Sequence, residues 1–553
     1  MLNIGVSSYE PPDSSTFGCL ARAGKLCASL EDSWGSQWVI AENDRSSFTG
    51  RQLEKRFEVR SPEWRMKYVL ALDQGTTSSR SLLFDEKGRV TRSAQMEFPQ
   101  YYPEPGWVEH DPEEIWTSQR ETLEAMVAEA EGGTIAGIGI SNQRETTVLW
   151  DAETGEAVYH AIVWQDRRTA ERCRRLKGEG REGEVAERTG LRLDPYFSAT
   201  KIEWILDHVD GVRERAEAGK LRFGTIDSWI IWKLTSGRVH VTDVSNASRT
   251  SLFNIHTLEW DEALLKMFRV PRAILPEVVD SSGVVGEWRG IPIGGMAGDQ
   301  QAALFGQACF DPGMAKNTYG TGCFLLMNTG GEAVSSENGL LTTIGWRIGS
   351  EVTYALEGSI FVAGALFQWL RDELKIVEIA SDLDKMAATV ADSGGCVVVP
   401  AFAGLGAPHW DPYARGAVFG LTRGTSQAQL CRASLEAVAL QCVELLGCME
   451  RDAGMKLLEL RVDGGASKSD LLMQIQSDLL QRKVLRPSHV ETTAFGAAAL
   501  AGLATGVWKN RGDFQRQWEL DRCFDPSGED FSGIKARWNR GVERVRGWEA
   551  DLQ

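Results

Sequence analysis

Long apolar runs, paired cysteines and surplus positive charge are all missing from this sequence of 553 residues. No window approaches the roughly 20 uninterrupted apolar residues that a membrane span needs, and the N-terminus lacks the basic-then-apolar layout of a secretory signal. The ten cysteines are scattered, with no CxxC pair and no histidine at metal-ligand spacing, which is typical of reduced structural thiols. We therefore expect a cytoplasmic protein with no membrane insertion.

The charge balance is acidic, with 60 Lys plus Arg against 77 Asp plus Glu and a formal charge of -17. This balance opposes non-specific attraction to nucleic acid and to anionic membranes, so we expect no nucleic-acid partner. A small-molecule partner is favoured instead. Because the chain exceeds what one hydrophobic core supports, at least two domains are expected.

Two familiar phosphate loops are absent as well. No G-x-x-x-x-G-K-[ST] occurs, and Gly137-Ile138-Gly139 is not completed into the dinucleotide fingerprint. Walker and Rossmann sites are therefore disfavoured. The chain has instead a polar turn from Asp73 to Arg80, which reads Asp-Gln-Gly-Thr-Thr-Ser-Ser-Arg.

The turn from Asp73 to Arg80 carries the groups that phosphate binding needs. Gly75 permits a tight turn, and Arg80 supplies a fixed cation. Backbone amides and hydroxyls can point inward from the three residues after the glycine, which are Thr76, Thr77 and Ser78. Asp73 is placed to hold Mg2+, through water. By itself the same pattern also fits an ordinary hairpin turn in which Asp73 caps amides.

Regular patterning begins abruptly at Met66. Residues 1–65 show no sustained period of 2 or 3.6, so we expect a disordered or non-native N-terminal extension, with Met66 as a candidate true start. From there the pattern predicts strands at 68–72 and 81–84, a helix after Asp111 towards Ala130, and a strand at 135–140. Asp111 followed by proline is a good helix start. This alternation favours an α/β fold.

A second hairpin resembles the first one. Residues 315–319 and 323–327 are strand-like and flank Gly320-Thr321-Gly322. Two lobes built on related hairpins would bring two Gly-Thr turns to one phosphate chain from both sides. Two unrelated hairpins that happen to use Gly-Thr are the alternative. We place the lobe boundary near residue 310.

The two turns resemble the paired phosphate turns of the actin-like ATPase superfamily. Further blocks at 141–147, 194–198 and 298–306 narrow the resemblance to the FGGY carbohydrate kinase family, and to its branch that phosphorylates glycerol. The resemblance runs from about Met66 to near residue 510. It implies an α/β fold of two actin-like ATPase (ribonuclease H-like) domains around a central cleft. It further implies an FGGY N-terminal domain at 66–310 for glycerol and phosphate, and an FGGY C-terminal domain at 311–553 for the nucleotide.

The resemblance also implies roles for the acceptor-side residues. ATP and Mg2+ would be used to phosphorylate glycerol, with Asp299 as the general base that takes the proton of the attacking hydroxyl. Gln300 would orient the same substrate. Side chains suited to the hydroxyls of a triol are Arg144, Glu145 and Tyr196. The aromatics expected along its carbon face are Trp164 and Phe324.

The nucleotide side is expected in the second half of the chain. A helix predicted at 360–370 would place Gly364 and Gln368 on one face. A strand at 458–462 leads into Asp463-Gly464-Gly465, with Ser467 and Asp470 at capping-box spacing. The resulting candidate ATP contacts are Thr76, Thr77, Ser78, Arg80, Thr321, Gly364, Gln368, Gly465 and Ser469. The family commonly has Asn where Ser469 stands, which puts one contact in doubt.

Alternatives remain at this level. Another FGGY kinase acting on a pentulose or similar sugar would share the phosphate turns and Asp299, whereas an actin-fold ATPase that is not a kinase would not need the acceptor-side cluster. By resemblance, a homodimer or homotetramer is expected. Some family members carry a longer glycine-rich loop that binds fructose 1,6-bisphosphate between the positions of Val285 and Pro292. This chain has only six residues there, which argues against that inhibitor site.

Overall fold

The computed structural model describes residues 25–30, 37–42, 66–130 and 132–550. The chain divides into two compact units, Met1–Arg65 and Met66–Gln553. In the first unit, where the sequence predicted no regular element, strands β1 (Lys25–Leu30) and β2 (Gln37–Glu42) pair antiparallel. The remainder of the predicted 1–65 extension lies outside the described residues.

The first large sheet of the second unit contains the predicted hairpin. Its strands, in sheet order, are β15 (Ser282–Trp288), β16 (Ile291–Gly298), β7 (Thr134–Asn142), β3 (Lys67–Gln74), β4 (Ser78–Asp85) and β5 (Val90–Glu97). β3 runs antiparallel to β4 but parallel to β7, and β7 runs parallel to β16. The carboxyl ends of β3, β7 and β16 therefore meet at one edge of this sheet.

The second large sheet repeats this arrangement. Its strands, in sheet order, are β19 (Leu341–Ile348), β20 (Glu351–Ile360), β18 (Cys323–Gly330), β17 (Met314–Tyr319), β23 (Glu459–Asp463), β24 (Val484–Pro487) and β25 (Leu520–Phe524). β17 is antiparallel to β18 and parallel to β23, as β3 is to β4 and β7. The predicted recurrence of a hairpin with a Gly-Thr turn is confirmed, whereas the boundary near residue 310 stays a prediction.

Besides the two large sheets, the second unit contains five short two-stranded sheets among the described residues. They are β6 (Glu109–His110) with β9 (Ala161–Ile162), β8 (Val148–Asp151) with β10 (Leu221–Gly224), β11 (Val241–Asp243) with β14 (Glu277–Val279), β12 (Phe253–Asn254) with β13 (Glu259–Trp260), and β21 (Val397–Val399) with β22 (Ala417–Phe419).

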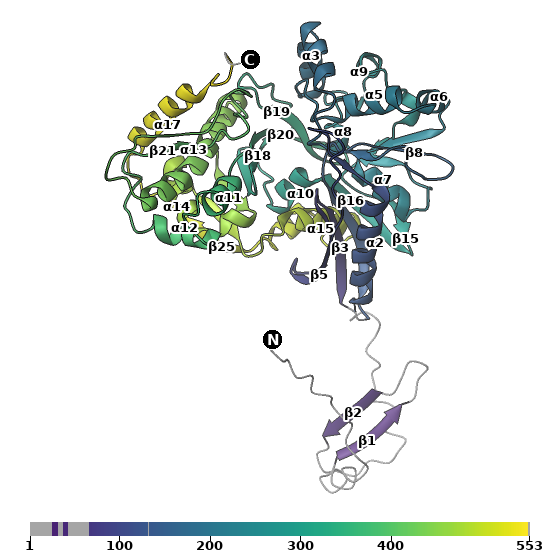
Figure 1. The fold of residues 1–553 in the computed structure, drawn as a ribbon. Coiled ribbons are helices and arrows are strands. Elements are labelled where there is room, and N and C mark those ends of the chain that lie inside the picture. The colour runs from purple at the N-terminus through teal and green to yellow at the C-terminus, as the bar shows by residue number, and fades with distance from the viewer. Residues whose placement is uncertain (1–24, 31–36, 43–65, 131, 551–553) are drawn as a thin grey trace. The chain divides into compact units, whose positions relative to one another are not determined.

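The helices cover the sheets and connect them (Figure 1). They are α2 (Pro112–Ala128), α3 (Ala170–Gly178), α4 (Glu182–Thr189), α5 (Ser198–His208), α6 (Val212–Glu217), α7 (Ile226–Leu234), α8 (Val244–Ala247), α9 (Glu262–Met267), α10 (Asp299–Gly306), α11 (Gly364–Asp372), α12 (Ala380–Ala387), α13 (Gln427–Ala453), α14 (Asp470–Leu480), α15 (Thr492–Ala504), α16 (Arg511–Gln515) and α17 (Ser532–Val545), with 3-10 turns η4 (Arg272–Ile274) and η5 (Gly465–Lys468). No helix in the described part of the chain is long and apolar enough to cross a membrane.

Helices α10 and α15 pack backbone against backbone between the two sheets. A Cβ on Gly496 would lie 1.8 Å from the carbonyl oxygen of Ala302, and one on Gly306 would lie 2.0 Å from that of Thr492. Only glycine permits such close approach. Helix α15 also packs on the first sheet, whereas α10 contacts β18 and β19 of the second. The crossing therefore joins the two halves of this unit.

Helix starts agree with the sequence in one case and differ in two. Asp111 caps α2 by accepting a hydrogen bond from the amide of Glu113, with proline at the first position, as predicted. The helix predicted at 360–370 begins only at Gly364, because β20 extends to Ile360. The predicted cap at Ser467 is wrong, since Ser467 donates to Gly464 O and Ser469 caps α14 through the amide of Leu472.

Candidate functional site

The turn between β3 and β4 is closed by a hydrogen bond from Gly75 N to Ser78 O at 2.9 Å. Asp73, at the end of β3, is 3% exposed and accepts a hydrogen bond from Ser141 Oγ at 2.8 Å. Arg80 forms an ion pair with Asp73, and this neighbouring carboxylate raises the pKa of Arg80. The two charged residues predicted for metal and phosphate therefore neutralise each other in this structure.

Buried polar side chains hold the turn in place. Gln100 donates to Thr76 O at 3.1 Å, and Gln143 donates to Gly75 O at 3.2 Å. His110 lies between them, with Nε2 at 2.7 Å from Gln100 Oε1. Burial lowers the pKa of His110 to about 3, so its imidazole is neutral near pH 7. The turn is thus fixed before any ligand binds.

Arg80 also contacts the second half of the chain. Its Nη1 lies 2.6 Å from a carboxylate oxygen of Glu491, which directly precedes α15. A cavity of about 590 Å³ opens beside this pair, with Lys468 and Arg486 in its wall. The candidate phosphate cation is therefore shared between a carboxylate of its own hairpin and one from the other half.

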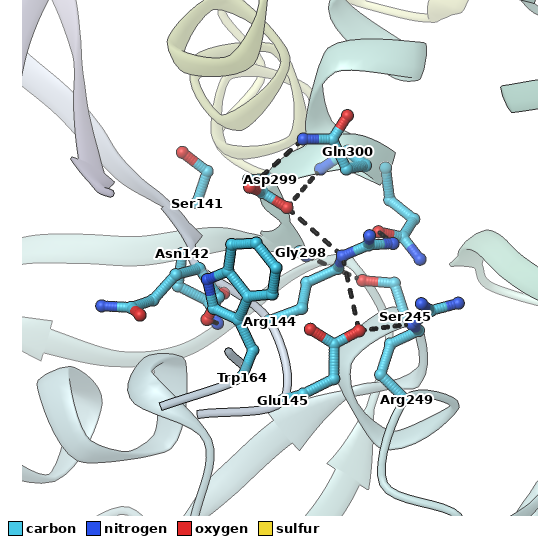
Figure 2. Close-up of polar contacts among 12 residues, drawn as sticks. Ser141, Asn142, Arg144, Glu145, Trp164, Ser245, Arg249, Gly298, Asp299 and Gln300 are labelled. Carbon is cyan, nitrogen blue, oxygen red and sulfur yellow. Dashed lines mark hydrogen bonds and ion pairs between the residues drawn. The ribbon is translucent and has the colours of Figure 1, made fainter. Parts of the chain in front are cut away.

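Asp299 is the first residue of α10, at the carboxyl end of β16. Its side chain is 33% exposed and lies 3.3 Å from Arg144 Nε. Gln300 donates to both of its oxygens, from the backbone N at 2.7 Å and from Nε2 at 3.3 Å (Figure 2). Burial raises the pKa of Asp299, although Arg144 and Lys316 oppose this. An accessible carboxylate with a raised pKa is suited to accept a proton.

Arg144 and Glu145 lie at the end of β7 and are almost fully buried. Arg144 makes a two-pronged ion pair with Glu357 of β20, at 2.5 and 2.9 Å. Glu145 accepts from Arg249 Nε at 2.7 Å, and Arg249 also donates to Glu357 at 3.1 Å. The predicted pair is therefore half of a buried four-residue ion cluster, part of which is drawn in Figure 2.

Sequence reasoning missed Glu357 and Arg249. Arg249 is fully buried, and its Nη1 has no hydrogen-bond partner among the described residues. Burial alone would raise the pKa of Glu357, but the attraction of Arg144 and Arg249 outweighs it and lowers the pKa to about 2. A weak signal for Arg249 was that the stretch 246–250, Asn-Ala-Ser-Arg-Thr, also fits the resemblance to the FGGY family. Glu357 lies in an ordinary strand pattern.

Two predicted aromatic residues lie beside this cluster. Tyr196 Oη is 3.5 Å from Arg144 Nη2, and its ring meets that of Trp164 edge-on at 5.5 Å. Burial and the neighbouring Glu145 raise the pKa of Tyr196, so its hydroxyl stays protonated. Trp164 Nε1 donates to Thr76 Oγ1 at 3.0 Å. Trp164 thereby joins the acceptor-side residues to the phosphate turn.

Phe324 is placed by strand register. It pairs with Thr318 across the hairpin and with Ser359 on β20. Since paired residues point to the same face of a sheet, Phe324 shares a face with Lys316, Thr318 and Glu357. It is half-buried. Among the residues that the structure describes, no hydrogen bond or ring contact links Phe324 to the cluster around Asp299.

The candidate nucleotide residues are more exposed than the acceptor-side ones. Thr321, Gln368 and Gly465 are exposed, while Gly364 and Ser469 are half-buried. Gly364 N donates to Gly320 O at 3.0 Å, and a Cβ on Gly364 would lie 2.6 Å from that oxygen. Glycine is therefore required at position 364 for a local reason, because the Gly-Thr turn at 320–321 approaches the start of α11 closely.

A magnesium ion would find few protein ligands here. In the described part of the chain, no group of three or more His, Cys, Asp or Glu side chains is arranged to hold a metal ion. Asp73 is the carboxylate beside the phosphate turn. One carboxylate suits an ion that keeps its waters and binds mainly to substrate phosphates. The residues beside the phosphate turn therefore fit a magnesium ion that is held mainly by substrate phosphates and water.

Comparison with known proteins identifies the two halves separately. The model for the N-terminal domain of the FGGY family of carbohydrate kinases matches residues 68–306, and that for its C-terminal domain matches residues 315–505.

Among relatives, the glycerol kinase of Symbiobacterium thermophilum is 59% identical over 494 residues, covering 88% of this chain and 99% of the relative. That of Burkholderia cenocepacia is 56% identical over 497 residues, with the same coverage. The crystal structure of Plasmodium falciparum glycerol kinase with ADP has a TM-score of 0.83 at 37% identity, covering 87% of this chain and 98% of that one. A xylulose kinase from Lactobacillus acidophilus, with a TM-score of 0.78 and 21% identity over 88% of this chain and 98% of its own, shares the fold.

Proposed function

Because the chain belongs to the FGGY family of carbohydrate kinases, we propose that it transfers the γ-phosphoryl group of ATP to glycerol, forming sn-glycerol 3-phosphate. One observation carries the proposal. Asp299 is an accessible carboxylate, held by Gln300 and Arg144, beside a buried cluster of hydrogen-bonding side chains. The relatives that share most of its length, at 56% and 59% identity, are glycerol kinases.

Asp299 is the proposed general base. It accepts the proton of the terminal hydroxyl while that oxygen attacks the γ-phosphorus in line. Arg144, Glu145 and Tyr196 are proposed to bind the other hydroxyls, with Gln300 orienting the chain of the triol. Trp164 and Phe324 are proposed to cover its carbon atoms. Because the ion cluster is buried and already paired, these groups need little reorganisation when glycerol enters.

The hairpin turn is proposed to receive the phosphates. Thr76, Thr77, Ser78 and Thr321 offer amides and hydroxyls to them, and Arg80 would exchange a carboxylate partner for phosphate oxygens. Gly364, Gln368, Gly465 and Ser469 are proposed to contact the nucleoside. A magnesium ion bound with ATP would neutralise charge on the phosphates, with Asp73 as its protein contact through water.

We further propose that residues 66–310 and 311–553 act as separate domains for acceptor and nucleotide. Self-association into a homodimer or homotetramer and a cytoplasmic location are proposed by resemblance to the family. Light scattering of the purified chain measures the mass of the assembly directly, and a monomer would contradict this part.

The proposed reaction is tested by measuring ADP release with glycerol, dihydroxyacetone, xylulose or no acceptor. We expect the highest kcat/KM with glycerol and almost no ADP without an acceptor. Preference for xylulose would assign another kinase of the same family, and equal turnover without acceptor would assign an ATPase. A parallel series with excess chelator is expected to abolish ADP release, with recovery when magnesium is restored.

A further inference from the structure

Lys316 on β17 is a fully buried cation that the steps above do not use. Its Nζ donates to Gln300 Oε1 and, at 2.9 Å, to Thr318 Oγ1. A buried ammonium is costly unless its charge and its donors are matched. The burial of this charge beside Gln300, the residue that follows Asp299, therefore suggests a role in the site.

The surroundings of Lys316 place it among the charges of the site. Asp463 of β23 and Glu357 of β20 belong to the same sheet, and Asp299 and Arg144 face it from α10 and the end of β7. Burial lowers the pKa of Lys316, while Asp463 and Asp299 raise it. Two of these carboxylates already have close partners: Arg144 and Arg249 for Glu357, and Gln307 and Thr492 for Asp463.

The bond between Lys316 and Gln300 fixes the direction of an amide. An ammonium group can only donate, so it requires the oxygen of Gln300. The amide nitrogen of Gln300 is then the atom that faces Asp299, at 3.3 Å from Oδ2. An ionised carboxylate has no proton to donate, so it acts only as a hydrogen-bond acceptor. The chain from Lys316 through Gln300 to Asp299 therefore favours an ionised Asp299, both of whose oxygens accept hydrogen bonds from Gln300.

We propose that Lys316 is a positioning residue for the phosphoryl transfer. It holds Gln300 in the orientation that donates to Asp299, and so favours the ionised form of the base and orients its carboxylate towards the acceptor hydroxyl. This inference rests on the proposed function, since it needs Asp299 to act as a base. It adds to that function a residue of the second sheet that controls the acceptor side.

The test compares Lys316→Met, Gln300→Ala and the double variant in the full chain. We expect kcat of K316M to fall about 100-fold, the size of loss that misplacing a reacting group causes, with a much smaller change in the KM for ATP. If Lys316 acts through Gln300, the loss in kcat of the double variant is clearly smaller than the product of the two single losses.

The pH profile separates positioning from support of the fold. The charge of Lys316 lowers the pKa of Asp299, as does Arg144, which remains in the variant. Removing Lys316 therefore raises that pKa and moves the acidic limb of kcat/KM to higher pH. Gln300→Ala keeps the lysine charge, so its limb is expected to move less.

A K316M enzyme with wild-type kcat and an unmoved acidic limb would overturn the inference, even if its Tm fell. Lys316 would then merely neutralise buried carboxylates. If K316M does not fold cooperatively, Lys316→Gln decides by the same two readouts, because it keeps a polar group and removes the charge. The proposed function fails separately: a wild-type enzyme active only on another acceptor overturns the choice of glycerol, and the variants are then compared on that acceptor.

Discussion

Replacing Glu357 by glutamine removes one charge from the buried ion cluster and leaves its shape. Glu357 is fully buried and accepts from Arg144 at 2.5 and 2.9 Å and from Arg249 at 3.1 Å. After E357Q, the two buried guanidinium groups keep Glu145, and Arg144 also keeps the partly exposed Asp299 at 3.3 Å. Removing one partner of a buried ion pair typically costs about 3–5 kcal/mol, because the other charge stays buried.

The pKa of Glu357 gives a second route to the magnitude. The arginines overcome burial and lower this pKa from 4.5 to about 2. A difference of this size corresponds to about 3 kcal/mol of stability at pH values above the pKa of the unfolded state. Because the folded pKa is depressed, this stability is present above pH 4.5 and is lost as the pH falls through about 2.

The assay is thermal and urea unfolding of wild type, E357Q and Glu124→Gln. Glu124 also pairs with an arginine, at 2.7 Å from Arg289, but the two side chains are 42% and 65% exposed. This surface pair is expected to contribute less than about 1 kcal/mol. We expect E357Q to unfold at clearly lower temperature and urea than E124Q, with the gap closing as the pH falls from 4.5 towards 2. Equal stability of E357Q and E124Q would refute the reasoning.

Three further outcomes are expected. Asp299→Asn should abolish phosphorylation while glycerol binding, followed by tryptophan fluorescence, stays measurable; near-normal turnover would contradict its role as base. Gly496→Ala should destabilise the fold by about 1–3 kcal/mol or more, because the added Cβ would lie 1.8 Å from Ala302 O. Gly183→Ala in α4 is the control: its Cβ meets open space, so it should be neutral or mildly stabilising in the same unfolding assay. Saturating fructose 1,6-bisphosphate should leave activity unchanged, since only Arg289 and Gly290 join β15 to β16, where the family resemblance implies a longer loop in members that bind this inhibitor; clear inhibition would count against this.

Local patterns predicted much of the fold. Apolar runs located β3, β7, β17 and β23 to within two residues at most ends, because both faces of these strands are largely buried. The repeated hairpin followed from the Gly-Thr turns. Helix ends were harder: three polar residues in a row, from 467 to 469, offered two serines as caps, and the choice of Ser469 depends on the 3-10 turn before it.

The acceptor site was predicted only in part. Arg144, Glu145 and Asp299 come directly after strands or begin a helix, where functional side chains are common, and family resemblance supplied their roles. Glu357 lies in the middle of a strand, 213 positions from Arg144. Its charge matters only because register turns it towards α10, and register across sheets leaves no local mark in a sequence. Lys316 was missed for the same reason.

The close crossing of α10 and α15 lies near Asp299, the first residue of α10. Asp299 lies three residues before Ala302, which is about 4.5 Å along the helix axis at 1.5 Å per residue. When one sheet rotates against the other about this contact, displacement grows with the length of the lever arm. In such a rotation Asp299, which lies close to the contact, would shift little. Such geometry would let other parts of the site move to fit a ligand while Asp299 keeps its position relative to the acceptor.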